Sequence, residues 1–350
     1  MKMGLFKTKQ TVEPDAIPTT VEEAIPVQDF YEDGIALVGR GLWSKTFRFS
    51  DINYATASRE RKEELFLGYS AILNSFDAGA MTKITVCNRR QSQSRFEKQN
   101  LLPLRGDRLD RYLDEYNRML TENAEQSSGI TQEKYLTVTV QKPNYGEAKS
   151  HFNRVESEFA ALFLSLGSRL EPLDAAEKLR VLFDFYHYGA EDDFLYEPER
   201  YGRRGCTFKD AIAPDSMEFR SDCFKIDGRY GRVLYLRDYA NFIKDSFLAE
   251  LTDIDRGLMF SIDCNPIPTD EAIRQGEGKL LAVETNISNW QRKQNRNQNF
   301  SADVPYDMEK QRAESREFLD DLVSRDQRMI PSLICLLYTS DAADDKARVD

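Results

Sequence analysis

Apolar and polar side chains alternate in several short stretches of the chain, which is the pattern of a half-buried β-strand. In residues 46–49 two phenylalanines alternate with Thr and Arg, and in residues 136–140 one Leu and two Val alternate with threonines. The run "CFKIDGRYGRVLYLRDY" places Asp227 and Gly228 between two apolar stretches. Both turn residues tolerate a positive φ, so this run predicts a tight β-hairpin. Further strands are predicted over the segments "GIALVG" (34–39), "KITVC" (83–87) and "LMFSID" (258–263).

Other stretches repeat apolar residues every three or four positions, which predicts amphipathic helices. The predicted helices span residues 60–76, 109–120, 152–166, 174–186 and 242–251. Asp107 is expected to cap the second of them, and the polar run "TENAEQSSG" is expected to follow it as a loop. Asp174 and Glu177 have the spacing of a capping box at the start of the fourth helix.

The pattern changes after the segment "CNPIPTDEA". A helix is predicted from Thr269, which precedes two acidic residues suited to a first helical turn. The polar segment "QNRNQNFSADVPYD" separates it from a second helical stretch, "MEKQRAESREFLDDLVSRDQRM". We therefore expect an α+β fold with mixed or antiparallel sheets and packed helices, followed by a long helical hairpin. The expected divisions are a mobile N-terminal arm (1–30), an α+β domain (31–265), the hairpin (266–329) and a terminal stretch (330–350).

Composition narrows the possible function classes. The 350 residues are 41% apolar and 31% charged, as in globular proteins, and their net charge of -11 argues against non-specific nucleic-acid binding by the whole surface. No stretch reaches the roughly 20 apolar residues of a membrane span, so a cytosolic protein is expected. The five cysteines are scattered singly and there are only two histidines, which disfavours disulfide frameworks and zinc sites.

No catalytic motif is visible along the chain. The nearest approach to a phosphate-binding loop, "RQGEGKLLA", has Ile273 where the first glycine belongs and Leu280 after Lys279. The acidic run at 191–193 has no accompanying histidine, so a solvated loop is the better interpretation. We therefore assign no catalytic, cofactor-binding or metal-ligating residue. A small-molecule pocket built from distant segments stays open as an alternative.

Two basic, amide-rich stretches are candidate nucleic-acid contacts, "NRRQSQSRF" and "NWQRKQNRNQNF". In the second, Trp290 lies close to Arg292, Lys293 and Arg296. An aromatic ring can stack on a base while neighbouring cations neutralise phosphates. Solvation of a helix end explains the same residues and is favoured here. A stand-alone nucleic-acid-binding module using the region around Trp290 is the alternative function.

Five long segments, in this order, carry a family resemblance. They are "YEDGIALVGRGLWSKTFRFSDINY", "FKIDGRYGRVLYLRDYANFIKDSFLAEL", "PIPTDEA", "VETNISNWQRKQNRNQNFSADVPYDMEKQR" and "EFLDDLVSRDQRM". The chain resembles the N-terminal half of the conjugal-transfer ATPases of type IV secretion systems. Among these it is most similar to the TraE/TrbE/CagE-like proteins of integrative conjugative elements from Gram-positive bacteria. The resemblance covers residues 31–329.

The resemblance implies an assembly domain of a machine for conjugative DNA transfer. Its implied partners are membrane-channel and coupling proteins, its implied location is cytoplasmic and peripheral to the inner face of the cell membrane, and the implied parent is a homo-oligomer. In the family, a separate C-terminal RecA-like domain carries the phosphate loop and uses ATP and Mg. This sequence stops before that loop, so no cofactor and no ATPase activity are expected of the chain, and no family catalytic residue can be carried over.

The end of the chain breaks the helical pattern that precedes it. The segment from Cys335 to Asp345, "CLLYTSDAADD", resembles the translation of a transposase-based sequencing-library adapter. Residues 330–350 are therefore expected to be a non-native tail, with native sequence ending between Met329 and Ile334. Such a tail is expected to contribute nothing to folding.

Overall fold

The computed structural model describes residues 18–54, 56–75, 79–90, 101–104, 106, 108–126, 130–188, 190, 193–200, 207–239, 244, 246–254, 256–296, 303–325 and 327–340. In this part of the chain the strands are β1 (Asp29–Phe30), β2 (Ala36–Gly39), β3 (Leu42–Phe49), β4 (Met81–Arg90), β5 (Ile130–Gln141), β6 (Leu170–Pro172), β7 (Met217–Phe219), β8 (Phe224–Ile226), β9 (Arg229–Tyr235), β10 (Leu258–Cys264) and β11 (Ser332–Ser340). The α-helices are α1 (Val21–Ala24), α2 (Arg59–Ser75), α4 (Asp110–Gln126), α5 (Tyr145–Leu166), α6 (Ala175–Tyr186), α7 (Phe247–Thr252), α8 (Thr269–Arg296) and α9 (Tyr306–Ser324). Two short 3₁₀ helices span Pro198–Arg200 and Phe208–Ala211.

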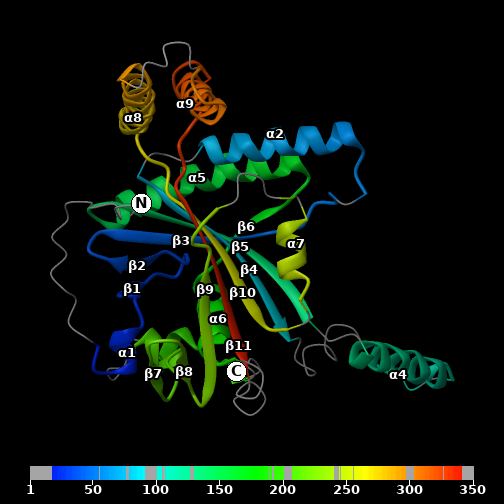
Figure 1. Ribbon diagram of the computed structural model, residues 1–350. Helices are drawn as coiled ribbons and strands as arrows, with labels where there is room; N and C mark the ends of the chain where they lie inside the picture. Colours follow the sequence, from blue (N-terminus) through cyan, green and yellow to red (C-terminus); the bar gives the residue numbers. More distant parts are fainter. Residues whose placement is uncertain are drawn as a thin grey trace.

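One twisted antiparallel sheet forms the centre of the molecule (Figure 1). Its strand order is β1-β2-β3-β5-β4-β10-β11-β9-β8-β7, with β6 pairing beside β3. Neighbouring strands run antiparallel in each described pair, including the β8–β9 hairpin at Asp227 and Gly228. Both turn residues have the positive φ that the sequence predicted, 46° and 85°. The predicted α+β class is confirmed.

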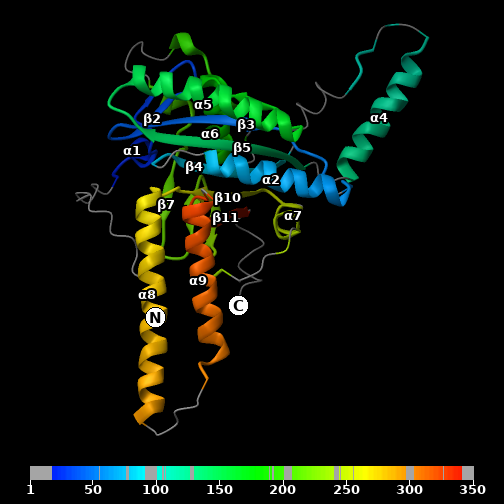
Figure 2. The same cartoon turned by 90° about the horizontal axis from the view of Figure 1, so that it is seen from above.

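Helices α5 and α2 lie together over one face of the sheet, as Figures 1 and 2 show. Alternation along β3 and β5 directs Phe47 and Leu136 toward this face, where they pack against Phe152 and Phe159 of α5. Phe47 and Phe152 are both 0% exposed. Helix α5 begins at the Asn144 cap, whose side chain accepts a hydrogen bond from the backbone N–H of Glu147. This layer is the main hydrophobic core.

Helix α6 covers the opposite face of the same strands. Its start has the capping box predicted from Asp174 and Glu177, with each side chain bonded to the other residue's backbone. Leu179 of α6 is fully buried in a second core that also contains Ile25 and Val27. The mobile arm expected over residues 1–30 is therefore packed in its described part, because two apolar residues around a proline enter this core. Residues 1–17 lie outside the described part.

The predicted helical hairpin is formed by α8 and α9, which extend away from the sheet side by side (Figure 2). Buried and half-buried positions recur along α8 at spacings of three and four, and those of α9 do the same. This is the seam of an antiparallel two-helix contact. At Gly276 the helices approach so closely that a Cβ would lie 2.7 Å from a methyl carbon of Leu319.

The terminal stretch differs from the expectation. Residues 332–340 form β11, which pairs with β10 on one side and with β9 on the other. Strand β11 is therefore central, and it is the strand through which β7, β8 and β9 join the rest of the sheet. A non-native tail that contributes nothing to folding was expected, because residues 335–345 resemble a translated adapter and the preceding helical pattern ends without a loop or cap. A burst of apolar residues is, however, also the pattern of a buried strand. Residues 341–350 lie outside the described part.

Smaller differences concern α4 and α7. Helix α4 continues to Gln126, so the run "TENAEQ" expected as loop is helical. Glu, Ala and Gln are strong helix formers, which outweighs the polar character of this run. Helix α7 begins only at Phe247, and most of residues 240–245 lie outside the described part together with the predicted cap Asp107.

Candidate functional site

The predicted nucleic-acid contact residues lie on the last turns of α8 but on different sides of it. Arg292, Lys293 and Arg296 are exposed, whereas Trp290 is half-buried. Trp290 follows the buried Ile287 by three positions, so it belongs to the stripe of α8 that faces α9. The structure thus groups the three cations on the solvent side and turns the indole toward the hairpin seam. A half-buried indole presents only part of its ring to a base.

The other basic stretch is divided in a similar way. Arg89, on β4, points to the α6 face of the sheet and forms ion pairs with Asp184 of α6 and with Glu133 of β5, the latter at 3.2 Å. Arg180 adds a second guanidinium to Asp184, at 2.8 Å. The side chain of Asp184 is only 3% exposed. Arg89 therefore holds α6 on the sheet, and residues 91–96 of the stretch lie outside the described part.

Burial and charge shift several pKa values in this ionic cluster. Burial raises the pKa of Cys87 and of Tyr135, whose hydroxyl also donates a hydrogen bond to Glu133. Burial lowers the pKa of Lys178 to about 8, and its ammonium donates a hydrogen bond to the hydroxyl of Thr46 at 2.6 Å. These groups lie between α6 and the sheet, and none of them lines the pocket described next. The cluster is therefore a packed ionic layer between α6 and the sheet.

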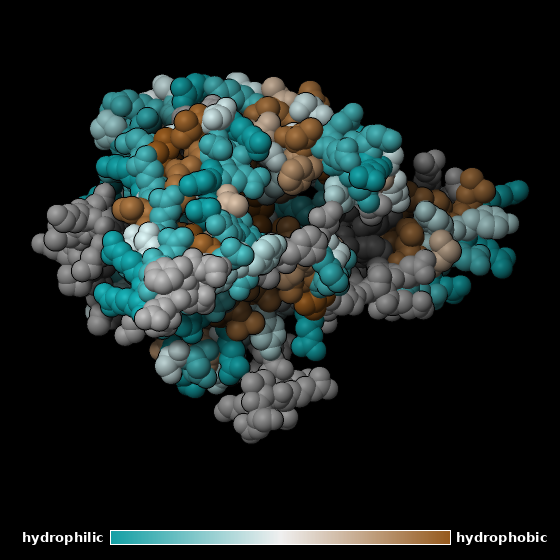
Figure 3. All heavy atoms as spheres, turned by 45° about the horizontal axis from the view of Figure 1, so that its top comes forward, coloured by the Kyte–Doolittle hydropathy of each residue, from teal (hydrophilic) through white to brown (hydrophobic). Residues whose placement is uncertain are grey.

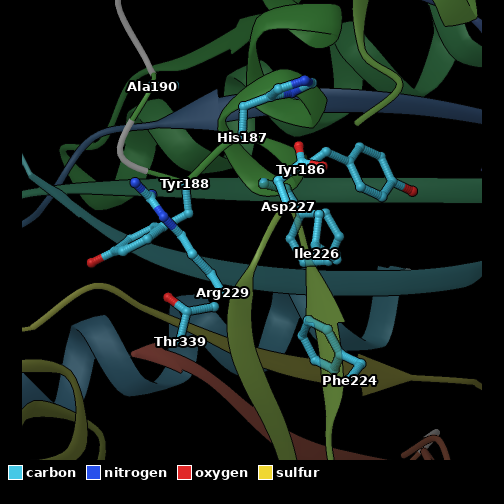
Figure 4. Close-up of a pocket in the computed structure, with 10 residues that line it drawn as sticks. Tyr186, His187, Tyr188, Ala190, Phe224, Ile226, Asp227, Arg229 and Thr339 are labelled. Carbon is cyan, nitrogen blue, oxygen red and sulfur yellow. The ribbon is translucent and has the colours of Figure 1, made fainter. Parts of the chain in front are cut away.

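A small pocket opens at the C-terminal end of α6 (Figure 4). Its volume is about 120 Å³, well below the roughly 300–1,000 Å³ of typical ligand sites. Phe224 and Ile226 of β8 form one wall, and the guanidinium of Arg229 lies over the ring of Tyr188 at 5.7 Å. The lining residues are Phe185, Tyr186, His187, Tyr188, Ala190, Phe224, Ile226, Asp227, Arg229 and Thr339. Such a lining suits a small planar or apolar group and is too small for a nucleotide.

His187 is the one imidazole that lines this pocket among the described residues. Its ring stacks on Phe183 with centroids 4.1 Å apart. The buried Nδ1 finds no hydrogen-bond partner within the described part of the chain. The carboxylate of Asp227 accepts hydrogen bonds from the backbone and the hydroxyl of Ser216, so it is committed to the turn. The pocket thus contains no assembled nucleophile and base.

Exposed apolar side chains gather on two other parts of the surface. One is α4, which stands apart from the sheet and shows brown atoms on the arm at the right of Figure 3. Tyr112 and Met119 of α4 are 69% and 47% exposed. The other is β9, where Val233 and Tyr235 are 53% and 64% exposed. Large contiguous apolar patches mark interaction sites more often than catalytic ones.

Metal, thiol and membrane chemistry add no site. No group of three His, Cys, Asp or Glu among the described residues could hold a metal ion. The four cysteines in that part of the chain are free thiols, and Cys206 lies outside it. Within the same ranges no helix is both long and apolar enough to cross a bilayer.

Sequence reasoning missed the ionic cluster and the pocket. Arg89 and Asp184 are 95 positions apart, and only the packing of α6 on the sheet brings them together. Arg89 and Cys87 are two positions apart on one strand, so their side chains point to the same face of the sheet. This spacing is the sequence signal that could have placed Arg89 on the face that carries Cys87. The pocket is built from three distant segments, so no local pattern announces it.

Comparison with known proteins gives no family. No protein-family model and no curated protein matches the chain.

Proposed function

We propose that this chain is an assembly domain of a conjugative DNA-transfer ATPase of the TraE/TrbE/CagE type. It docks on membrane-channel and coupling proteins at the inner face of the cell membrane. The observation that carries the proposal is the hairpin of α8 and α9, which extends beyond the sheet from β10 and returns to β11 (Figure 2). An arm of this kind offers a long surface to a protein partner, and the resembling segments of the sequence include it.

The described segment that comes nearest to a phosphate loop does not fit a nucleotide. The segment around Gly278 and Lys279, the nearest approach to a phosphate loop, lies inside α8. Backbone N–H groups in a helix interior are already bonded to carbonyls four residues earlier, so they cannot wrap a phosphate. ATP and Mg belong to the implied parent, and we expect no ATP hydrolysis above background from the purified chain.

The alternative of a nucleic-acid-binding module gains no observation here. Trp290 is turned toward the seam, and the cations near it form one small exposed group on an acidic protein. Fluorescence anisotropy with single-stranded and duplex oligonucleotides tests it directly. Salt-dependent binding that is lost in the Arg292→Ser/Lys293→Ser/Arg296→Ser variant would favour this alternative over the assembly role.

The assembly role predicts interference in living cells. Expressed in a donor strain that carries the conjugative element encoding it, the chain should occupy docking sites of the native ATPase and lower the frequency of DNA transfer. The hairpin variant Leu281→Ser/Val323→Ser should relieve this inhibition, because it removes two exposed apolar side chains of the arm, 66% and 64% exposed. The matched control is Phe66→Ser/Leu67→Ser on α2, with 65% and 67% exposure. Unchanged transfer in the presence of abundant folded chain contradicts the proposal.

A further inference from the structure

Helix α4 is an amphipathic helix, and exposed apolar side chains line one side of it. Leu109, Tyr112, Tyr116 and Met119 are 61%, 69%, 45% and 47% exposed. Figure 1 shows α4 clear of the sheet and of the other labelled helices. Two side chains tie the helix to the segment before it. Asn117 accepts a hydrogen bond from the backbone N–H of Leu102 and donates one to its carbonyl, and the carboxylate of Asp110 accepts one from the backbone N–H of Gly106. Apolar residues at such exposure are unfavourable until another surface covers them.

The exposed residues follow a heptad. Positions 109, 112, 116 and 119 are spaced by three, four and three, which is the a/d seam of a two-helix coiled coil. On one side of the seam, Leu113 and Leu120 are half-buried. The segment 101–104, called the strap below, is held to the helix by Asn117. The other edge carries Glu115 and Glu122, seven positions apart, and Arg108 lies in the turn two residues before the helix begins. Such a seam is specific for a second helix.

Charge argues against a membrane or a nucleic acid as the occupant. Helix α4 contains five acidic and two basic side chains, a net charge of -3. Interfacial helices that bind anionic lipids carry Lys and Arg on the polar face, and nucleic acids require the same. A protein helix is the occupant that remains, and the seam itself has the features needed to pair with a copy of itself.

We propose that a second copy of the chain covers this face, with the two α4 helices packed antiparallel about a two-fold axis near Asp114. In this register Tyr112 of each helix lies against Tyr116 of the other, and Leu109 lies against Met119. The pairing is self-complementary, as a two-fold interface requires. The inference goes beyond the assembly role and stands on α4 alone, so it holds or fails independently of conjugation.

The charged edge supports the same register. With Tyr112 against Tyr116, Arg108 of each copy comes opposite Glu122 of the other, giving two equivalent ion pairs. Glu122 lies 3.8 Å from Arg118 of its own helix, but both side chains are more than 60% exposed and free to turn. Glu115 meets its own copy near the axis, which is the one unfavourable charge contact. An exposed ion pair contributes only about 0.2–1 kcal/mol, so the edge sets register more than affinity.

The available area fits a small specific interface. A large apolar or aromatic side chain buries on the order of 100–250 Å² when fully covered, so the half-exposed residues of the seam and the strap offer several hundred Å² per copy. Standard interfaces bury about 800 Å² per partner. We therefore expect a micromolar dimer rather than an obligate one.

Sedimentation equilibrium of the 350-residue chain tests the proposal. The wild-type chain should reversibly dimerise, and Tyr112→Ser/Met119→Ser should raise the dissociation constant roughly 10- to 100-fold, because two seam side chains are lost from each copy. The matched control is Leu281→Ser on α8, 66% exposed, which should leave the constant unchanged. Circular dichroism and the melting temperature verify that each variant is folded.

Charge reversal sharpens the test of register. Arg108→Glu and Glu122→Arg should each weaken the dimer about 3- to 10-fold, because each change acts twice in a symmetric pair, and the double variant should restore it. Glu115→Gln should tighten the dimer by removing the repulsion at the axis.

Three results would overturn the proposal. One is a chain that stays monomeric at high concentration. A second is a dimer indifferent to Tyr112→Ser/Met119→Ser. The third is a monomer that floats with phosphatidylcholine–phosphatidylglycerol vesicles and loses this binding in the same variant, which would make the seam a lipid contact. A monomer that still lowers DNA transfer would refute the dimer and leave the assembly role intact.

Discussion

The two halves of the central sheet are stabilised in different ways. Strands β3, β5 and β4 are covered by α5 and α2 on one face and by α6 on the other, and their inward residues, such as Phe47 and Leu136, are almost fully buried. In β9, at the other half, Val233, Leu234 and Tyr235 are 53–64% exposed. Alternation therefore specifies which face a side chain takes, while the helices decide whether that face is buried.

This difference shows where the free energy of folding is concentrated. Burial of apolar surface is the dominant stabilising term, so the covered half should carry most of the stability. The uncovered half depends on backbone hydrogen bonds between strands, and β11 is the strand that connects it to β10. The predictions below test this division in order of the expected effect.

Removal of β11 should have the largest effect. Deletion of residues 331–350 takes out the strand between β10 and β9, so β7, β8 and β9 lose their attachment to the sheet. We expect the melting temperature to fall by roughly 10 °C or more and the segment 217–235 to become sensitive to protease. Differential scanning calorimetry and limited proteolysis measure the two effects.

Deletion of residues 341–350 is the control for this experiment, because it leaves β11 whole. It should leave the melting temperature close to that of the full chain. If neither deletion changes the melting temperature, the pairing of β11 contributes nothing to stability. That is the result that the sequence alone predicted for the whole stretch from Ile330 onward.

The contrast between the halves also marks what could be predicted from sequence. The turn at Asp227 and the capping box at Asp174 were predictable because each depends on residues a few positions apart. The pairing of β11 with β10 was not, since Leu336 meets Phe260 only through the fold. An apolar run of this length is ambiguous without its neighbours, and resemblance to an adapter sequence said nothing about its pairing.

The features of the candidate site also differ in whether they depend on local sequence or on tertiary packing. The helix carrying Trp290 and the cations near it could be predicted from periodicity, and the periodicity also contained the placement of Trp290 beside Ile287 on one stripe. That α9 covers this stripe depends on tertiary packing. The pocket near His187 depends on three separate segments, so its existence could not be inferred from any one of them.

Truncation of an apolar side chain should lower the free energy of unfolding by several kcal/mol more in the covered half than in the uncovered half. Phe152→Ala removes a ring that is 0% exposed beneath the α5 layer, and we expect a loss of about 3–5 kcal/mol in the free energy of unfolding. Val233→Ala in the uncovered half should change it by less than about 0.5 kcal/mol. Urea denaturation of both variants measures the difference. Equal losses would mean that β9 is buried in solution, for example by another molecule.

Two glycines provide a finer comparison. A Cβ on Gly34, at a φ of 76°, would lie 2.0 Å from the carbonyl oxygen of Leu173, which is backbone of the covered half and cannot move aside. Gly34→Ala should therefore cost about 2–3 kcal/mol. A Cβ on Gly231 would lie 2.2 Å from the far end of the half-buried Phe224 ring, which is a side chain that can turn and has the pocket beside it. Gly231→Ala should cost less than about 1 kcal/mol, and chemical denaturation of the pair checks the ratio.

The smallest effect concerns Lys178, beneath α6 in the covered half. Burial lowers its pKa to about 8 from the ordinary 10.5, so below pH 8 the ammonium is charged in both the folded and unfolded chain and its burial penalty is fully present. Between pH 8 and 10.5 the folded chain releases this proton while the unfolded chain still holds it, and stability rises with pH. Cys87 and Tyr135 act in the opposite direction because burial raises their pKa values.

The Lys178→Met variant isolates the lysine, since Cys87 and Tyr135 titrate in both proteins. From pH 7.5 to 9.5 the wild-type chain should gain about 1–2 kcal/mol relative to the variant. Urea denaturation at several pH values gives the difference, and Lys149→Met at an exposed site is the control that should show no such gain. A difference that stays constant with pH would mean that water reaches the ammonium beneath α6, and the covered half would then be less tightly closed than its apolar layer indicates.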